Sequence, residues 1–136
     1  MTNIKGWLKQ ARDIQEELIQ LKTEKQKIWD ELVNITGSLK ERVQTSSVGQ
    51  SDQRVLKYME YDQLITQKMM ELMAAKTEIE AVIEKVPKSK YRRLLRYYYI
   101  SGYTWEETAE AMSIDVRSVY RMHGQALLCV EEVKKI

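Results

Sequence analysis

The chain has 136 residues, of which 43% are hydrophobic and 31% charged, and its formal net charge at pH 7 is +2. One proline and five glycines favour an all-helical protein, and the single cysteine, Cys129, excludes an internal disulfide and a cysteine-based zinc site. No apolar run approaches the ~20 residues of a membrane span and no signal-peptide core is visible, so we expect a cytoplasmic protein with no membrane partner.

Residues 1–39 are predicted to form one long helix. Apolar side chains recur there at intervals of three and four residues, with Lys25 as the one polar interruption. Together they form a seam: Ile4, Trp7, Ala11, Ile14, Leu18, Leu21, Ile28, Leu32, Ile35 and Leu39. A seam of this length is typical of a coiled coil.

A second long helix is predicted from about Arg54 to Val86. Its stripe is interrupted by Asp62 and Lys76 and consists of Tyr58, Ile65, Met69, Leu72, Ile79, Ile83 and Val86. Two helices of similar length are expected to fold back on each other as a coiled-coil-like antiparallel hairpin.

Further apolar residues lie beside these two seams, namely Leu8, Trp29, Val33, Met59, Met70 and Met73. They either widen the core stripe or leave apolar surface for a partner, and a second copy of the chain is the partner we expect.

Residues 40–53, Lys40 to Gln53, are rich in Ser, Gln and Gly and are predicted to form a loop. Two interpretations stay open: the loop is mobile, or its Arg42 and hydroxyl side chains contact phosphate or a protein. Pro87 disfavours helical geometry at Val86 and marks a domain boundary. Residues 1–86 are therefore expected to oligomerise or bind a partner, and residues 87–136 to bind DNA.

After Pro87, Ser89 is expected to cap a new helix that ends near Gly102. Leu94, Leu95 and Tyr98 are predicted to face inward. Arg92, Arg93 and Arg96 are predicted to face outward, where they either hold the phosphate backbone of a nucleic acid or form solvated surface.

Residues 104–124, TWEETAEAMSIDVRSVYRMHG, have the pattern of a helix-turn-helix. Thr104 and Glu107 form a capping box that starts the first helix, and Ala109 supplies the small side chain that two crossing helices need. Ser113 occupies the turn, and Asp115 caps the second helix. Inward positions are predicted at Thr108, Met112, Ile114, Val119, Met122, Leu127 and Val130.

The second helix of this motif leaves Arg117, Ser118, Tyr120, Arg121 and Gln125 pointing outward. Arg pairs bidentately with guanine and Gln with adenine, while Ser and Tyr bond phosphate. Residues 86–136 also carry nine Lys and Arg against six Asp and Glu, whereas residues 1–85 carry 13 against 14. The pattern predicts double-stranded DNA as the partner; the alternative is a polar helix face.

An enzyme is not indicated. His123, the one histidine, is predicted on the outer part of the recognition helix, and Cys129 faces another side, so no nucleophile and base are paired. No glycine-rich phosphate loop is present, and no cofactor or metal site is expected.

Residues 91–133 resemble region 4 of the bacterial sigma-70 factors, whose recognition helix reads the −35 promoter element. The run is YRRLLRYYYISGYTWEETAEAMSIDVRSVYRMHGQALLCVEEV. It is more closely similar to small phage and prophage proteins of Gram-positive bacteria, kin to the ArpU and RinA late-transcription regulators, and residues 39–47, LKERVQTSS, also resemble that group.

This resemblance implies an all-α protein in which a helical hairpin precedes a three- to four-helix domain of the sigma-70 region 4 type. It implies a regulator of phage or prophage transcription in a bacterial host, with RNA polymerase as a further possible contact, and the apolar surface of the hairpin predicts that this regulator is a dimer. Arg117, Ser118 and Arg121 correspond to its base-reading and phosphate-reading side chains. No counterpart of the promoter-melting sigma region 2 is present, so a self-sufficient sigma factor is not implied. The alternative function is a small terminase-like subunit for DNA packaging.

Overall fold

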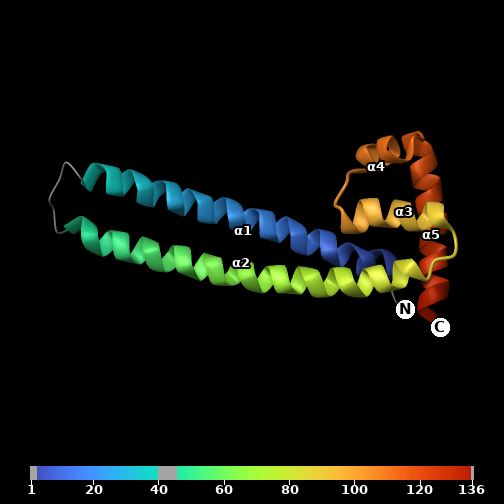
Figure 1. Ribbon diagram of the computed structural model, residues 1–136, viewed down its shortest axis with the longest axis horizontal. Helices are drawn as coiled ribbons and strands as arrows, with labels where there is room; N and C mark the ends of the chain where they lie inside the picture. Colours follow the sequence, from blue (N-terminus) through green and yellow to red (C-terminus); the bar gives the residue numbers. More distant parts are fainter. Residues whose placement is uncertain (1–2, 40–45, 136) are drawn as a thin grey trace. The chain divides into compact units, whose positions relative to one another are not determined.

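The protein is described here from a computed structural model, which covers residues 3–39 and 46–135, with side chains for residues 3–34 and 53–135. The described elements are α1 (Ile4–Leu39), α2 (Ser46–Glu84), α3 (Ser89–Leu95), the π-helical turn η1 (Arg96–Ile100), α4 (Trp105–Met112) and α5 (Val116–Lys135) (Figure 1). All of them are helical, so the predicted all-α class, with a long hairpin followed by a helix-turn-helix domain, is confirmed.

The second helix begins earlier than predicted. Helix α2 starts at Ser46, so residues 46–53 are helical, and the expected loop from Lys40 to Gln53 is wrong over that part. Residues 40–45 lie outside the described residues. Serine suits a first helical turn and glutamine is a good helix former, while the one glycine, Gly49, costs only about 1 kcal/mol relative to alanine. The polar composition that resembles a loop is therefore compatible with a helix.

Residues Glu16–Glu71 form one compact unit, the hairpin unit. Ion pairs link its two helices: Glu17 lies 2.9 Å from Lys68, Lys25 lies 2.6 Å from Asp62, and Glu31 lies 3.4 Å from Arg54. As the residue number rises along α1, the partner's number falls along α2, which is the register of an antiparallel pair. The ring centroids of Trp29 and Tyr58 lie 5.7 Å apart and continue this register.

The other compact unit, the recognition unit, comprises residues 1–15 and 72–136. Its core combines side chains from both ends of the chain. The described buried apolar residues are Ile4, Leu8, Ala11, Leu72, Ala75, Ile79, Ile83, Val86, Tyr91, Leu94, Leu95, Tyr99, Ala109, Val119, Ala126 and Val130. The expected boundary at Pro87 thus falls inside this unit, because the first turns of α1 and the last turns of α2 share its core.

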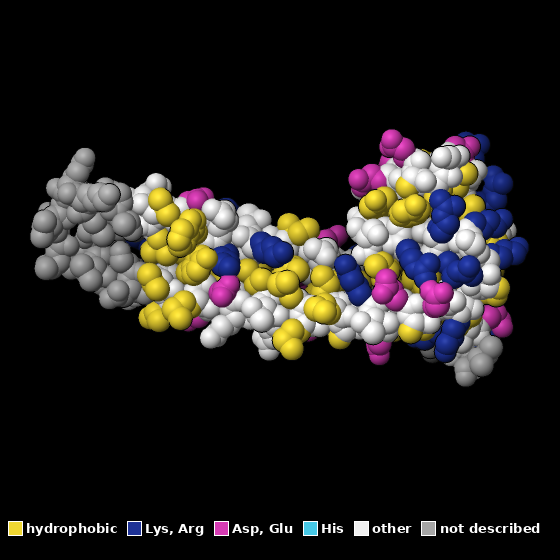
Figure 2. All heavy atoms as spheres, viewed as in Figure 1, with side chains coloured by type: hydrophobic (Ala, Val, Ile, Leu, Met, Phe, Trp, Pro, Cys, Tyr) yellow, Lys and Arg dark blue, Asp and Glu magenta, His cyan; other side chains and the backbone are white. Residues whose placement is uncertain are grey.

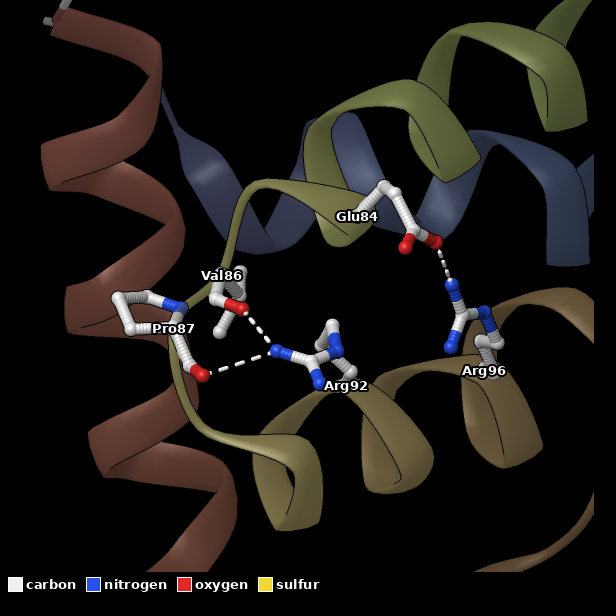
Figure 3. A network of polar contacts seen from close by, with 5 residues as sticks. All are labelled: Glu84, Val86, Pro87, Arg92 and Arg96. Atoms are coloured by element: carbon white, nitrogen blue, oxygen red, sulfur yellow. Dashed lines mark hydrogen bonds and ion pairs between the residues drawn. The ribbon is translucent and has the colours of Figure 1, made fainter.

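The turn between α2 and α3 is held by an arginine. One Arg92 nitrogen, Nη1, donates to the carbonyl oxygens of Val86 at 2.6 Å and Pro87 at 2.9 Å (Figure 3). Lys88 is the N-cap residue of α3 and makes no side-chain cap, so the expected cap at Ser89 is wrong. The helix starts one residue earlier than that cap requires, which makes Ser89 its first helical residue.

Leu8 tests whether α1 belongs to the recognition unit. Its side chain is fully buried, so Leu8→Ala should lower the free energy of unfolding by about 2–5 kcal/mol through lost contacts and the cavity left behind. Hydrogen exchange should be faster in α3–α5, which are distant from Leu8 in sequence. The control is Ile19→Ala, where 56% of the side chain is exposed and we expect a change within about 0.5 kcal/mol. Unchanged exchange in α3–α5 would contradict the shared core.

Candidate nucleic-acid interface

The first helix of the helix-turn-helix, α4, begins with the predicted capping box. The Glu107 backbone N–H donates to the Thr104 hydroxyl at 3.1 Å, and the Thr104 N–H donates to the Glu107 carboxylate at 2.9 Å. Hydrogen bonding with Thr104 lowers the pKa of Glu107, and the Thr104 backbone contributes more to this shift than the Thr104 side chain. The negative charge therefore persists at the positive end of the helix dipole, which stabilises the start of α4.

The turn between α4 and α5 is also as predicted. Ser113 adopts the left-handed conformation, with φ 58° and ψ 41°, and the Ile114 N–H donates to the Ala109 carbonyl at 3.0 Å. Asp115 then caps α5, because its Oδ1 accepts the Ser118 backbone N–H at 2.7 Å. Hydrogen bonding with Ser118 lowers the pKa of Asp115, and the Ser118 side chain contributes more to this shift than its backbone N–H. Two local caps thus set the ends of the turn.

Helix α4 packs against α5 through small or β-branched side chains. Ala109 and Thr108 are buried on α4, and Val119, Ala126 and Val130 are buried on α5. The Thr108 hydroxyl donates to the Thr104 carbonyl at 2.8 Å, which satisfies its polar group inside the core. Ala109 is thus buried, as expected for a small side chain where two helices cross.

His123 is the clearest error of the sequence analysis. The sequence predicts it on the outer part of the recognition helix, but its side chain is only 8% exposed. Its Nε2 lies 2.6 Å from the Tyr99 hydroxyl, and its ring centroid lies 4.6 Å from that of Trp105. Burial, with a smaller contribution from Lys5, lowers the pKa of His123 to about 4, and burial also raises the pKa of Tyr99. The imidazole is therefore neutral in the core, where its Nε2 and the Tyr99 hydroxyl share a hydrogen bond.

The residues predicted to read DNA are mostly accessible. Arg117, Tyr120, Arg121 and Gln125 are exposed on α5, whereas Ser118 is half-buried. Ser118 is also engaged in the Asp115 cap, and the Gln125 amide oxygen accepts the Tyr91 hydroxyl. The helix therefore presents two exposed guanidinium groups and an exposed tyrosine, while Ser118 and Gln125 already have partners within the protein.

The three arginines predicted to hold phosphate differ in their surroundings. Arg93 is exposed, whereas Arg92 and Arg96 are half-buried. Arg92 bonds the carbonyls of the preceding turn, and Arg96 forms an ion pair with Glu84 of α2 (Figure 3). A guanidinium carries five N–H donors, so these bonds leave donors on both groups for a further partner. Among these three arginines, Arg93 is the most accessible to a phosphate group.

Two lysines near α3 add to this basic surface and are missed by sequence reasoning. Lys88 and Lys90 are exposed, and their ammonium groups lie 5.6 and 5.4 Å from the centroid of the Tyr91 ring. The signal that could have revealed them is the density of basic residues in KSKYRR. Lys and Arg side chains gather over α3 and α5 (Figure 2), which suits a polyanion.

Residues 76–130 match the family model described as Sigma-70, region 4. The match covers the last turns of α2 together with α3, η1, α4 and most of α5. No curated protein and no solved structure matches the chain significantly.

This match identifies the helix-turn-helix as sigma-70 region 4-like. A domain of this kind is a DNA-binding regulatory domain, which indicates a DNA-binding function related to transcription. Within the part of the chain that the structure describes, no three His, Cys, Asp or Glu side chains gather in a way that could hold a metal ion. Over the same residues, every helix is too short or too polar to cross a membrane.

The buried His123 predicts an acid sensitivity of the recognition unit. Its folded pKa of about 4 lies below the ordinary value of 6.5, so the unfolded chain binds an extra proton between these values. The free energy of unfolding should therefore fall as the pH drops from about 6.5 to about 4, by at most about 3 kcal/mol. Urea titrations of the wild type and His123→Gln across this range measure it. The glutamine variant should lose the part of the slope due to His123, and identical slopes would contradict the assignment.

Proposed function

We propose that the protein is a sequence-specific DNA-binding transcription regulator of phage or prophage genes, acting in the cytoplasm of a bacterial host. The observation that carries this proposal is a capped, well-packed helix-turn-helix that matches Sigma-70, region 4 and exposes Arg117 and Arg121 on its second helix. The phage assignment rests on the resemblance of residues 39–47 and 91–133 to the ArpU and RinA group.

In this proposal α5 enters the major groove, and Arg117, Ser118, Tyr120, Arg121 and Gln125 are the side chains that face DNA. The two exposed arginines are best suited to base edges, because their N–H groups donate no hydrogen bond within the described part of the chain. Arg93, with the remaining donors of Arg92 and Arg96, would contact the phosphate backbone and set the position of the domain.

The hairpin unit supports the dimer in this proposal. Among its described side chains, only Leu18 and Ile65 are buried apolar residues. Large apolar side chains are exposed at nine positions of the same unit: Ile19, Trp29, Val33, Val55, Leu56, Met59, Leu64, Met69 and Met70. Two helices form a single layer, and a helical layer needs a second one to bury its apolar stripe.

One side of the hairpin unit has a groove that suits such a second layer. Its lining is mixed: Trp29, Tyr58, Ile65 and Met69 are apolar or aromatic, the Lys25–Asp62 ion pair crosses it, and the remaining lining residues are Lys22, Gln26 and Thr66. Yellow side chains run along the hairpin in Figure 2. Packing this face against the same face of a second copy would create a four-helix bundle with twofold symmetry. Such a dimer would present two recognition helices to two half-sites.

RNA polymerase is the further partner in this proposal, since region 4 of sigma factors acts in the context of that enzyme. Any apolar surface of the hairpin left uncovered by the second copy would be available to it. Chromatin immunoprecipitation of the tagged protein in its host, with and without a polymerase inhibitor, would identify the bound promoters and show whether occupancy depends on the polymerase.

The recognition helix supplies the first test of this function. Arg117→Ala and Arg121→Ala should each weaken binding to a site selected from random DNA by about 1–3 kcal/mol, because a bidentate contact to a base is lost. Fluorescence titration measures the affinity, and circular dichroism checks the helix content. Both side chains are exposed, so folding should be unaffected. A folded double variant with unchanged affinity would show that this face does not read DNA.

Arg93→Ala is the matched comparison, since it also removes one exposed arginine. If Arg93 contacts phosphate, the variant should bind selected and unrelated DNA more weakly to the same extent, and its salt dependence should become shallower by roughly one unit of slope. A loss confined to the selected site would assign Arg93 to sequence reading instead.

The dimer is tested at Met69, which lines the groove and is 44% exposed. Met69→Lys should keep the hairpin helical but place a charge in the interface, so sedimentation at tens of micromolar should change from dimer to monomer. Affinity for a two-half-site DNA should fall as avidity is lost. Gln67→Lys, an exposed position outside the groove lining, is the control and should remain dimeric. A monomeric wild type would contradict the dimer, and an assembly of eight or more chains would favour DNA packaging.

A further inference from the structure

Arg12 of α1 reaches the segment that leads into the helix-turn-helix. Its Nη1 donates to the carbonyl oxygen of Tyr98 at 2.7 Å and to that of Tyr103 at 3.0 Å. The carbon at the centre of its guanidinium also lies 4.0 Å from the centroid of the Tyr98 ring. One half-buried side chain near the start of the chain therefore bonds both η1, at Tyr98, and the connection that leads from η1 to α4, at Tyr103.

This connection needs a donor from another part of the chain. Carbonyl groups at the end of a helix lack the N–H partners of the next turn. Gly102, in the left-handed conformation with φ 77°, turns the chain away from η1, and the Tyr103 N–H reaches back to the Tyr97 carbonyl at 3.0 Å. Arg12 supplies the donors for the carbonyls of Tyr98 and Tyr103, which holds the chain direction into α4.

From Arg12, a continuous column of aromatic rings leads to the recognition helix. Tyr98 stacks on Trp105, the first residue of α4, with ring centroids 3.6 Å apart and planes 9° apart. Trp105 in turn meets Tyr120 at 5.7 Å and His123 at 4.6 Å, both edge-on. These last two residues belong to α5, and Tyr120 is on its exposed face.

We propose that Arg12 is a positioning residue for DNA recognition, which makes the first turns of α1 a working part of the DNA-reading domain. It holds Tyr98, Tyr98 supports Trp105, and Trp105 sets the orientation in which α5 presents Tyr120 and its neighbouring arginines. The inference rests on the proposed DNA-binding function. Arginine suits the role because one guanidinium nitrogen bonds two carbonyls while the planar face of the group lies on an aromatic ring, and a lysine ammonium has no such planar face.

The test compares Arg12→Ala and Arg12→Lys with Lys9→Ala as the matched control. Lys9 lies on the same turns of α1, is exposed and forms an ion pair with Asp13 at 3.9 Å, so Lys9→Ala removes the same charge without changing the aromatic contacts. One measurement needs no DNA: the indole N–H resonance of Trp105, assigned with Trp7→Phe and Trp29→Phe variants, and amide exchange in residues 116–124. The other is affinity for a selected site and for unrelated DNA, with the salt dependence of each.

Arg12→Ala should shift the Trp105 resonance, speed exchange in the recognition helix and weaken binding to the selected site by roughly tenfold, a change of about 1.4 kcal/mol. Affinity for unrelated DNA and the salt slope should stay the same, because Arg12 itself touches no phosphate. Arg12→Lys should recover part of the loss, and Lys9→Ala should behave as the wild type. If Arg12→Ala does not fold, the milder lysine variant decides the question by the same measurements.

An unchanged Trp105 resonance and unchanged exchange in α5 would overturn the inference whatever the DNA results are. Equal weakening for selected and unrelated DNA with a shallower salt slope would also overturn it, since Arg12 would then be a phosphate contact. A wild type that binds no DNA, combined with the expected response of Trp105 and α5, would refute the proposed function alone. The link between Arg12 and the recognition helix would then stand.

Discussion

The recognition unit depends on the stacking of Tyr98 on Trp105. These two rings join η1 to the start of α4, and Trp105 extends the contact to Tyr120 and His123 on α5. Large aromatic side chains bury much area for little conformational entropy, which matters in a domain with few residues. The cluster also explains why His123 is neutral, since a charged imidazole in this place would lack a counter-ion and most of its hydration.

A helix-turn-helix domain of about fifty residues buries a small share of its surface, so its stability by itself would be marginal. The protein meets this constraint by including the first turns of α1 and the last turns of α2 in the same core. Leu8, Ile83 and Val86 are as completely buried as the core residues of α3 and α5. Lys134 near the C-terminus also places its ammonium 3.5 Å from the centroid of the Trp7 ring. The DNA-reading domain is therefore assembled from segments that are distant in sequence.

The hairpin unit, in contrast, buries few of its described apolar side chains. Its helices are joined by ion pairs between exposed or half-buried side chains, which contribute little to stability in water. The large apolar side chains that remain exposed on it, such as Trp29, Met59 and Met70, account for the expectation that it has a partner. The same chain thus contains a unit with a core of its own and a unit whose apolar surface is largely unburied.

Much of this architecture was predictable because it depends on neighbours a few residues apart. The capping box of Thr104 and Glu107, the left-handed turn at Ser113 and the Asp115 cap involve atoms within one helical turn, so residue type and spacing suffice. The heptad pattern likewise predicted both long helices. The start of α2 was missed, because serine and glutamine occur in loops and in exposed helices alike and their pattern does not separate the two.

Other features were decided only by the tertiary structure. Arg92 and Arg12 bond backbone carbonyls, which every residue possesses, so nothing in the sequence distinguishes them from the exposed Arg93 and Arg117. The burial of His123 depends on Tyr99 and Trp105, which other helices bring to it. The sequence by itself determined the two long helices apart from the start of α2, the caps of α4 and α5, and the helix-turn-helix motif. The packing of distant segments decided which polar side chains face solvent, because burial and hydrogen-bond partners are set by atoms that come together only in the folded chain.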